Sequence, residues 1–166
     1  MRGRLIQKFI VHIARLDAQA TQAVGYDPEF NEPIPSADGS QLGGDPRRYH
    51  GADVLRCQLD RKSWGEVVAT RGGQEIKADI IITLFWKELE NRALLNAKMQ
   101  PVFQRGDKVV KILTLKGALE EEFDDPPGMF ITDLTRAGHG LAAFATPRTN
   151  LLYVYCSYDR KGDETQ

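Results

Sequence analysis

The 166-residue sequence predicts a mainly β protein, a small antiparallel β-barrel or sandwich that carries a long extended arm and one short helix. The main observation lies in residues 102–158, where runs rich in Val, Ile, Leu, Phe and Tyr alternate with Gly, Pro, Asp and Asn. The runs recur about every 10 to 15 residues, which is typical of a meandering sheet that closes on itself. With 42% hydrophobic and 27% charged residues, the chain reads as one globular domain over residues 1–166.

Charge and hydropathy exclude two classes of partner. The formal net charge is −1, from 22 basic and 23 acidic residues, whereas a dedicated duplex-binding domain carries a basic excess. No run approaches the ~18 uninterrupted apolar residues of a membrane span. The apolar start of the chain is broken by Lys8 and His12, so we expect no signal peptide.

The first predicted strand covers residues 5–16, where β-branched residues outweigh a competing helical spacing. Residues 18–51 differ in character, because four prolines and five glycines prevent a helix or a central strand. About 30 irregular residues exceed an ordinary loop, and the spaced apolar residues Tyr26, Phe30 and Ile34 would suit an arm laid along a neighbouring subunit. An equal alternative is that they attach the loop to its own domain.

The remaining elements are predicted from the alternation of apolar and polar residues and from the turn-forming residues between the runs. Residues 52–59 predict a half-buried strand, and residues 77–86 predict a central strand buried on both faces. Good helix formers at 88–98 predict the short helix. Further strands are predicted at 108–115, 118–123, 129–135, 141–145 and 151–158, with turns at 105–107, 116–117 and 125–128. In the first of these turns, Gly106 provides the bend and Asp107 closes it.

Cys57 and Cys156 each lie inside a predicted strand. One disulfide would be possible between them. With no secretory signal expected, buried thiols that act as small hydrophobic groups are favoured.

No residue pattern points to a reaction or a cofactor. His12, His50 and His139 lack the spacing of metal ligands, and no phosphate-binding loop or nucleophile elbow occurs. We therefore predict no catalytic residue, no metal and no cofactor. The acidic run Glu120, Glu121 and Glu122 is typical of a solvated face or of a strand edge protected from pairing. The enzyme alternative is a small hydrolase that uses Asp79 or Glu88 with a histidine.

A second alternative is a nucleic-acid-binding module. Aromatic residues Tyr49 and Trp64 lie near a local basic cluster, as on the single-strand platforms of OB-like barrels. Interleaved acids at Asp45, Asp53 and Asp60 reduce the local excess. The basic residues are Arg47, Arg48, Arg56, Arg61 and Lys62.

The order of the segments VLRCQL, FWKELE, RGDKV, DPPG and PRTNLLYV resembles that in small head–tail connector proteins of tailed bacteriophages, the head-closure or stopper group. The resemblance covers residues 52–158 and rests on strand order rather than on one motif. The arm at 18–51 is longer than in the simplest members, and 87–101 is an insertion of this chain. These departures leave tail terminator and tail-completion protein as alternatives.

The resemblance implies a β-barrel without enzymatic activity that forms a six- or twelvefold homo-oligomeric ring in the virion neck, after synthesis in the host cytoplasm. Its partners would be the portal or adaptor side of the capsid and the tail rings. Genome DNA would pass through without sequence-specific binding, and no membrane would be involved. On this hypothesis Tyr26, Phe30 and Ile34 form interfaces, while Glu120, Glu121 and Glu122 face the lumen.

Overall fold

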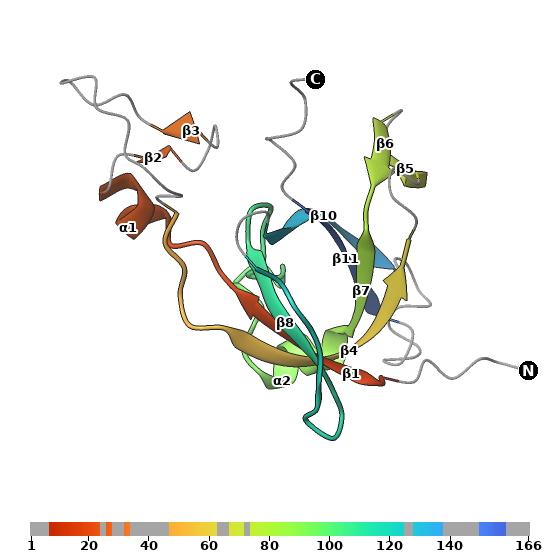
Figure 1. The fold of residues 1–166 in the computed structure, drawn as a ribbon. Coiled ribbons are helices and arrows are strands. Elements are labelled where there is room, and N and C mark those ends of the chain that lie inside the picture. Colours follow the sequence, from red (N-terminus) through yellow and green to blue (C-terminus); the bar gives the residue numbers. More distant parts are fainter. Residues whose placement is uncertain are drawn as a thin grey trace, which may run out of the picture.

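The computed structural model is a closed barrel of six antiparallel strands with one additional strand (Figure 1). It describes residues 7–23, 26–27, 32–33, 47–62, 67–71, 74–124, 128–137 and 150–158. Around the barrel the order is β1-β4-β7-β11-β10-β8 and back to β1. Their bounds are β1 Phe9–Ala14, β4 Asp53–Arg61, β7 Ile80–Phe85, β8 Lys108–Thr114, β10 Met129–Ala137 and β11 Leu151–Tyr158. The predicted fold class, a mainly β small barrel, is confirmed.

Closure depends on β1, which pairs along one edge with β4 and along the other with β8. Val11 is opposite Leu55 on one side and Ile112 on the other, and all three side chains are fully buried. Alternate residues along each strand therefore point into the barrel. Because every edge of the six strands is paired, the barrel is held by its backbone as well as by its core.

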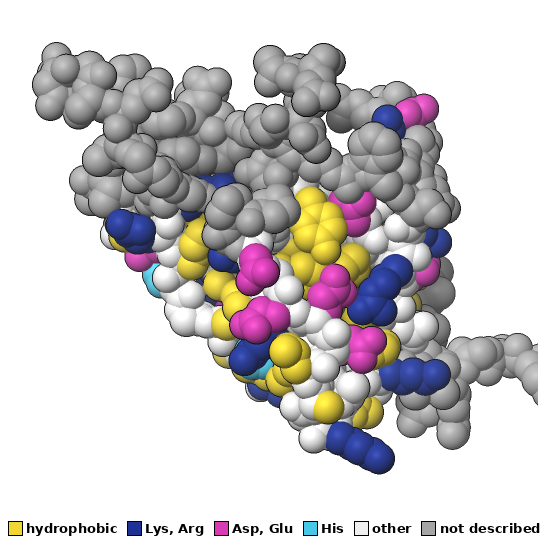
Figure 2. Space-filling view, viewed as in Figure 1, with side chains coloured by type: hydrophobic (Ala, Val, Ile, Leu, Met, Phe, Trp, Pro, Cys, Tyr) yellow, Lys and Arg dark blue, Asp and Glu magenta, His cyan; other side chains and the backbone are white. Residues whose placement is uncertain are grey.

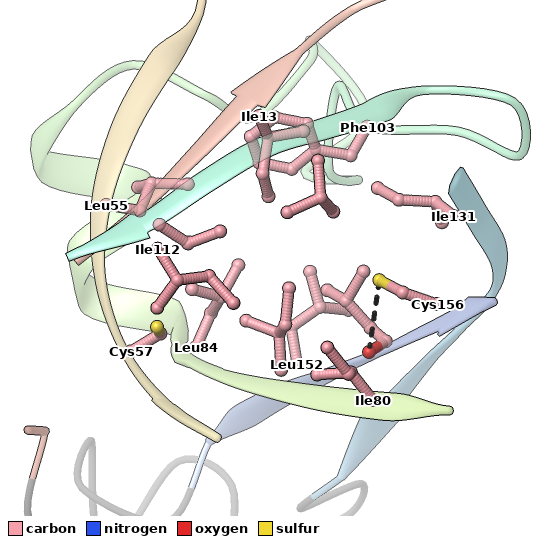
Figure 3. Packing of buried hydrophobic residues seen from close by; sticks show 14 of the residues in the cluster. Ile13, Leu55, Cys57, Ile80, Leu84, Phe103, Ile112, Ile131, Leu152 and Cys156 are labelled. Atoms are coloured by element: carbon pink, nitrogen blue, oxygen red, sulfur yellow. Dashed lines mark hydrogen bonds between the residues drawn. The ribbon is translucent and has the colours of Figure 1, made fainter. Parts of the chain in front are cut away.

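Apolar side chains fill the interior (Figure 3). Leu55, Ile112, Ile131 and Leu152 come from four different strands and point toward one another. Cys57 and Cys156 are free, buried thiols of this core, as predicted. Burial raises the pKa of Cys57 to about 12 and raises that of Cys156 as well, so both behave as hydrophobic groups.

Strand β7 lies between β4 and β11, as its apolar sequence predicts, but it is not buried on both faces. Ile80, Ile82 and Leu84 are buried in the core. On the outer face Ile81 and Phe85 are half-buried, and only Thr83 between them is buried. A barrel has an inside and an outside, so a strand in its wall has one outer face even when its sequence is continuously apolar.

The two helices differ from expectation. The helix α2 spans Trp86–Asn91 rather than 88–98, and Trp86 and Leu89 are its buried residues. It ends early because Ala93 has a left-handed backbone conformation, φ +55°, at which the Leu94 N–H donates to the Leu89 carbonyl at 2.9 Å and closes the helix. Beyond it, the side-chain oxygen of Asn96 accepts the backbone N–H groups of Lys98 and Gln100, both at 2.9 Å, and stabilises a turn.

The helix α1 spans Ala18–Ala23, inside the segment in which no helix was expected. This local stretch, AQATQA, contains neither proline nor glycine. The Asp17 side chain accepts the backbone N–H of Ala20 at 2.9 Å and caps the first turn. Beyond it, β2 (Tyr26–Asp27) and β3 (Glu32–Pro33) form a two-residue antiparallel pair.

Three further strands complete the elements. The strands β5 (Val67–Arg71) and β6 (Gln74–Lys77) pair with each other outside the barrel, and β9 (Leu119–Glu122) pairs with β8. The predicted hairpin turn before β9 is confirmed, with Gly117 at φ +83° and the Thr114 N–H donating to Ala118 at 2.8 Å. The predicted strand at 141–145 lies outside the described residues.

Since neighbouring barrel strands run in opposite directions, their connections divide between the two ends. One end, called here the arm end, carries the chain between β1 and β4 and the α2 segment between β7 and β8. The opposite end carries the β5–β6 hairpin and β9. Each end holds one cluster of charged residues.

Candidate functional site at the base of the arm

The long insertion between β1 and β4 is closed at its base by a short antiparallel ladder. The Asp17 N–H donates to the Arg48 carbonyl at 2.8 Å, and the His50 N–H donates to the Arg15 carbonyl at 2.8 Å. Leu16 and Tyr49 form the bridge between these two bonds. The chain therefore leaves and re-enters the barrel at one point, and residues 18–47 form an arm held by a defined stem.

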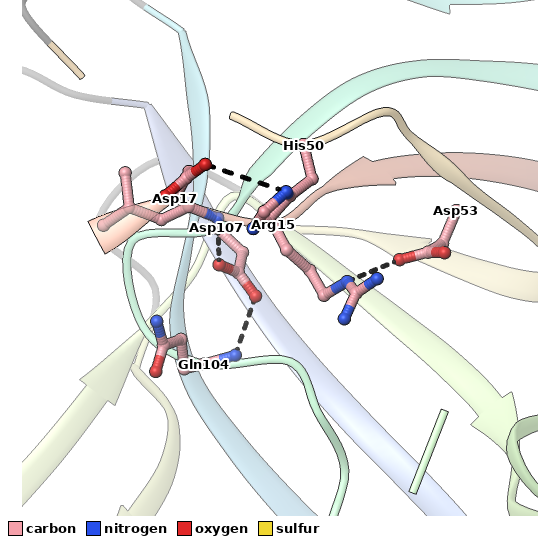
Figure 4. A network of polar contacts seen from close by, with 7 residues as sticks. Arg15, Asp17, His50, Asp53, Gln104 and Asp107 are labelled. Carbon is pink, nitrogen blue, oxygen red and sulfur yellow. Dashed lines mark hydrogen bonds and ion pairs between the residues drawn. The ribbon is translucent and has the colours of Figure 1, made fainter. Parts of the chain in front are cut away.

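Asp107, in the loop before β8, holds this stem by a hydrogen bond between its side chain and the backbone of Leu16 (Figure 4). One carboxylate oxygen accepts the Leu16 N–H at 2.9 Å, and the other accepts the Gln104 N–H at 2.8 Å. The side chain is fully buried, and this burial raises its pKa to about 6 although both backbone N–H bonds act in the opposite direction. A single carboxylate thus connects the end of β1, the start of β8 and the stem.

The preceding glycine permits this placement. Gly106 has φ +91°, a conformation that side chains rarely adopt, and the Asp107 N–H closes the turn on the Gln104 carbonyl at 3.3 Å. The predicted roles of Gly106 and Asp107 in the turn at 105–107 are confirmed. The contact from Asp107 to Leu16 was not anticipated, because a buried acid before an apolar strand was the only signal and its partner lies 91 residues away.

One ion pair and one histidine–carboxylate contact surround the buried carboxylate. Arg15 contacts Asp53 at 2.8 Å, and His50 lies 3.9 Å from Asp17. All four side chains are partly exposed, so each pair contributes at most about 1 kcal/mol. Their geometry orients the stem, while the buried hydrogen bonds of Asp107 supply its rigidity.

At the opposite end, the predicted acidic run forms strand β9. Arg61 lies 2.9 Å from Glu121 and 3.7 Å from Glu120, and the Tyr158 hydroxyl donates to Glu121 at 3.3 Å. Burial raises the pKa of Tyr158, and the charge of Glu121 raises it further. Glu120 and Glu121 are therefore engaged with the barrel itself, while Glu122 is exposed opposite Lys111.

The predicted interface residues are described only in part. The backbone of Tyr26 pairs with that of Pro33 in the β2–β3 pair. Phe30 and Ile34 lie outside the described residues.

At least three of the five sequence-adjacent basic residues contact other side chains, and Arg48 and Arg56 are exposed. Arg61 is paired with glutamates, Lys62 contacts Asp60 at 2.8 Å, and Arg47 stacks on the Phe130 ring at 4.2 Å. Trp64 lies outside the described residues. The barrel has six strands, whereas an OB-fold has five. These observations weaken the nucleic-acid-binding alternative.

The structure does not bring together the residues of the hydrolase alternative, Asp79, Glu88 and a histidine. Asp79 precedes β7 and accepts the Tyr158 N–H at 3.1 Å, whereas Glu88 follows β7 and pairs with Arg92 at 2.8 Å. The two carboxylates are thus at opposite ends of one strand. His12 lies on the outside of β1, His50 belongs to the arm stem and His139 lies outside the described residues.

Within the part of the chain that the structure describes, no three His, Cys, Asp or Glu side chains gather as a metal site would require. Nor does any helix there have the length and apolar character needed to cross a membrane.

The fold and the stem define a class: a six-stranded antiparallel barrel with a long anchored insertion between its first two strands. Comparisons with protein-family models, with curated proteins and with solved structures found no match.

Proposed function

We propose that the protein is a non-enzymatic structural subunit that assembles with copies of itself, its arm contacting a neighbour. The observation that carries this proposal is the stem. The barrel is filled, and Asp107 together with the 15–17/48–50 ladder holds the two ends of the 30-residue insertion at one point of it. Binding segments are commonly loops positioned by such a rigid scaffold.

In its specific form, the proposal is a ring in the neck of a tailed bacteriophage, between the portal or adaptor side of the capsid and the tail. Support comes from the order of the strand segments described above and from the closed barrel, which suits side-by-side packing in a ring. Tail terminator and tail-completion protein are neighbouring roles within the same class.

The stem makes a clean test possible. Because Leu16 and Tyr49 are bridged, an Asn-Gly turn can replace residues 18–47 without moving either end of the barrel. We expect this variant to keep the thermal unfolding transition of the barrel and to lose self-assembly in sedimentation velocity and negative-stain microscopy. A wild-type chain that stays monomeric at high concentration, or a truncated chain that still assembles, would contradict the proposal.

A finer variant addresses the predicted anchors. Replacing Tyr26, Phe30 and Ile34 together by serine removes apolar contacts and leaves the arm in place. We expect assembly to weaken by at least about tenfold, since a few buried aromatic and aliphatic anchors dominate most interfaces. The matched control replaces the polar arm residues Asn31 and Gln41 by serine and should assemble like the wild type. For the neck role, the readout is whether added protein joins heads to tails in extracts that lack it.

A further inference from the structure

The strands β4, β1, β8 and β9 are neighbours in that order, and their outward residues align in two rows. Residues directly opposite one another on paired strands share a face. We call this surface the outer face. The first row holds Arg56, Ile10, Leu113 and Leu119, and the second holds Val54, His12, Lys111 and Glu122.

The outer face contains a partly exposed apolar row. Ile10, Leu113 and Leu119 run across three adjacent strands; Ile10 and Leu113 are half-buried, and Leu119 is 57% exposed. At the tip of the same hairpin Leu115 is 49% exposed, and Val54 in the second row is 37% exposed. Figure 2 shows apolar side chains among charged ones over the lower end of the molecule, where Figure 1 places the β8–β9 hairpin. Adjacent exposed aliphatic residues of this kind mark interaction surfaces.

Basic residues flank this apolar row. Arg56 lies at one end of the first row, Lys111 lies in the second, and exposed Lys8 directly precedes β1. Burial and the charge of Lys111 lower the pKa of His12, so at neutral pH this histidine adds no positive charge. The acid aligned in the rows is Glu122, at the outer margin on β9. A partner segment for this surface should be acidic and carry spaced apolar side chains.

The arm has this chemistry. Between residues 18 and 46 the sequence has no Lys or Arg, and the apolar residues there include Tyr26, Phe30, Ile34 and Leu42. The carboxylates of the segment are Asp27, Glu29, Glu32, Asp38 and Asp45. Charge and apolar content are thus complementary between the arm and the outer face.

We propose that the arm of one copy lies on the outer face of a second copy. Its apolar side chains would pack on the Ile10–Leu113–Leu119 row, and its carboxylates would face Arg56 and Lys111. Every copy offers one arm and one such face, so the contact is head-to-tail and repeats from copy to copy, as in a ring whose rotation closes. This inference rests on the self-assembly proposed above and names the surface that receives the arm.

Two charge-reversal variants test it. The face variant carries Arg56→Glu and Lys111→Glu, and the arm variant carries Asp27→Lys, Glu29→Lys and Glu32→Lys. Each alone places like charges across the contact, so we expect the concentration at half-assembly to rise at least about tenfold. The control Lys77→Glu with Lys98→Glu makes the same charge change at two exposed residues away from the outer face, and should assemble like the wild type.

Mixing the two variants supplies the decisive readout. In a 1:1 mixture the basic arm of one variant meets the acidic face of the other, and the two native partners also meet. Alternating copies can then close an even-numbered ring, and we expect the mixture to assemble within about threefold of the wild-type concentration. An arm that folds onto its own barrel cannot produce this rescue.

The remaining outcomes separate the two proposals. If the wild type assembles and the face variant does so equally well, the outer face is not the receiving surface, and self-assembly stands. If both variants fail alone and the mixture also fails, the pairing of arm and face is wrong. If the wild type never assembles, the proposed function falls and this inference falls with it.

Discussion

The two ends of the barrel use carboxylates in opposite ways. At the arm end, Asp107 is fully buried and accepts two backbone N–H groups. At the other end, Glu120 and Glu121 are partly exposed and share Arg61. A buried acceptor bonded to the backbone fixes chain geometry, whereas exposed ion pairs contribute little and are screened by salt. We infer that the arm end is built for rigidity and the β9 end for solubility.

The two ends should differ most in how much the free energy of unfolding falls when one carboxylate is removed from each. Asp107→Ala leaves the Leu16 and Gln104 N–H groups without acceptors in a buried site, and should lower the free energy of unfolding by about 2 to 4 kcal/mol. The matched variant Glu121→Ala removes a partly exposed acceptor and should cost less than about 1 kcal/mol. Denaturant unfolding measures both, and equal losses would remove the distinction between the ends.

The pH dependence of stability sharpens the same comparison. The pKa of Asp107 is about 6 in the folded protein against an ordinary value of 3.8, so the folded state binds this proton more tightly. The corresponding stabilisation is complete below pH 3.8 and is lost as the pH rises through 6. Over that interval the contribution of this group falls by roughly 2 to 3 kcal/mol.

Asp107→Asn isolates this contribution. Asparagine resembles the protonated acid in shape and does not titrate, and one lost acceptor adds an offset that is independent of pH. The unfolding free energy of the wild type minus that of the variant should therefore decrease as the pH rises from 4 to 6.5. A flat difference would mean that Asp107 titrates normally despite its burial.

Much of the barrel follows from local sequence patterns. The strand at 151–158 was predicted with its observed bounds, and 108–115 differs from β8 by one residue, because alternation and β-branched content are local signals. The helix α1 is not predicted, because four prolines dominate the composition of segment 18–51, although the local stretch AQATQA is free of proline and Asp17 caps it. Composition averaged over 34 residues hides a six-residue helix.

The candidate site was less accessible from sequence than the fold. Asp107 was correctly predicted to close a turn, but its bond to Leu16 depends on the closure of β1 onto β8, a contact between distant parts of the chain. The glutamates were predicted as a solvated or protective run, and the partner Arg61 lies 60 residues from Glu121. Which distant residues meet depends on the order of the strands in the sheet. The alternation of residues within a single strand does not reveal that order.

We expect the smallest loss of stability from removing the ion pairs at the β9 end. Arg61→Ala leaves Glu120 and Glu121 without their shared counter-charge, and should lower the free energy of unfolding by less than about 1 kcal/mol at low salt. The loss should shrink further at about 1 M salt, where the Debye length is only about 3 Å. The control Arg105→Ala removes a longer pair, 3.4 Å from Asp133, on a side chain that is 73% exposed, and should change less still. A loss that exceeds that of Asp107→Ala, or that salt leaves unchanged, would show that the β9 end also fixes the geometry of the chain.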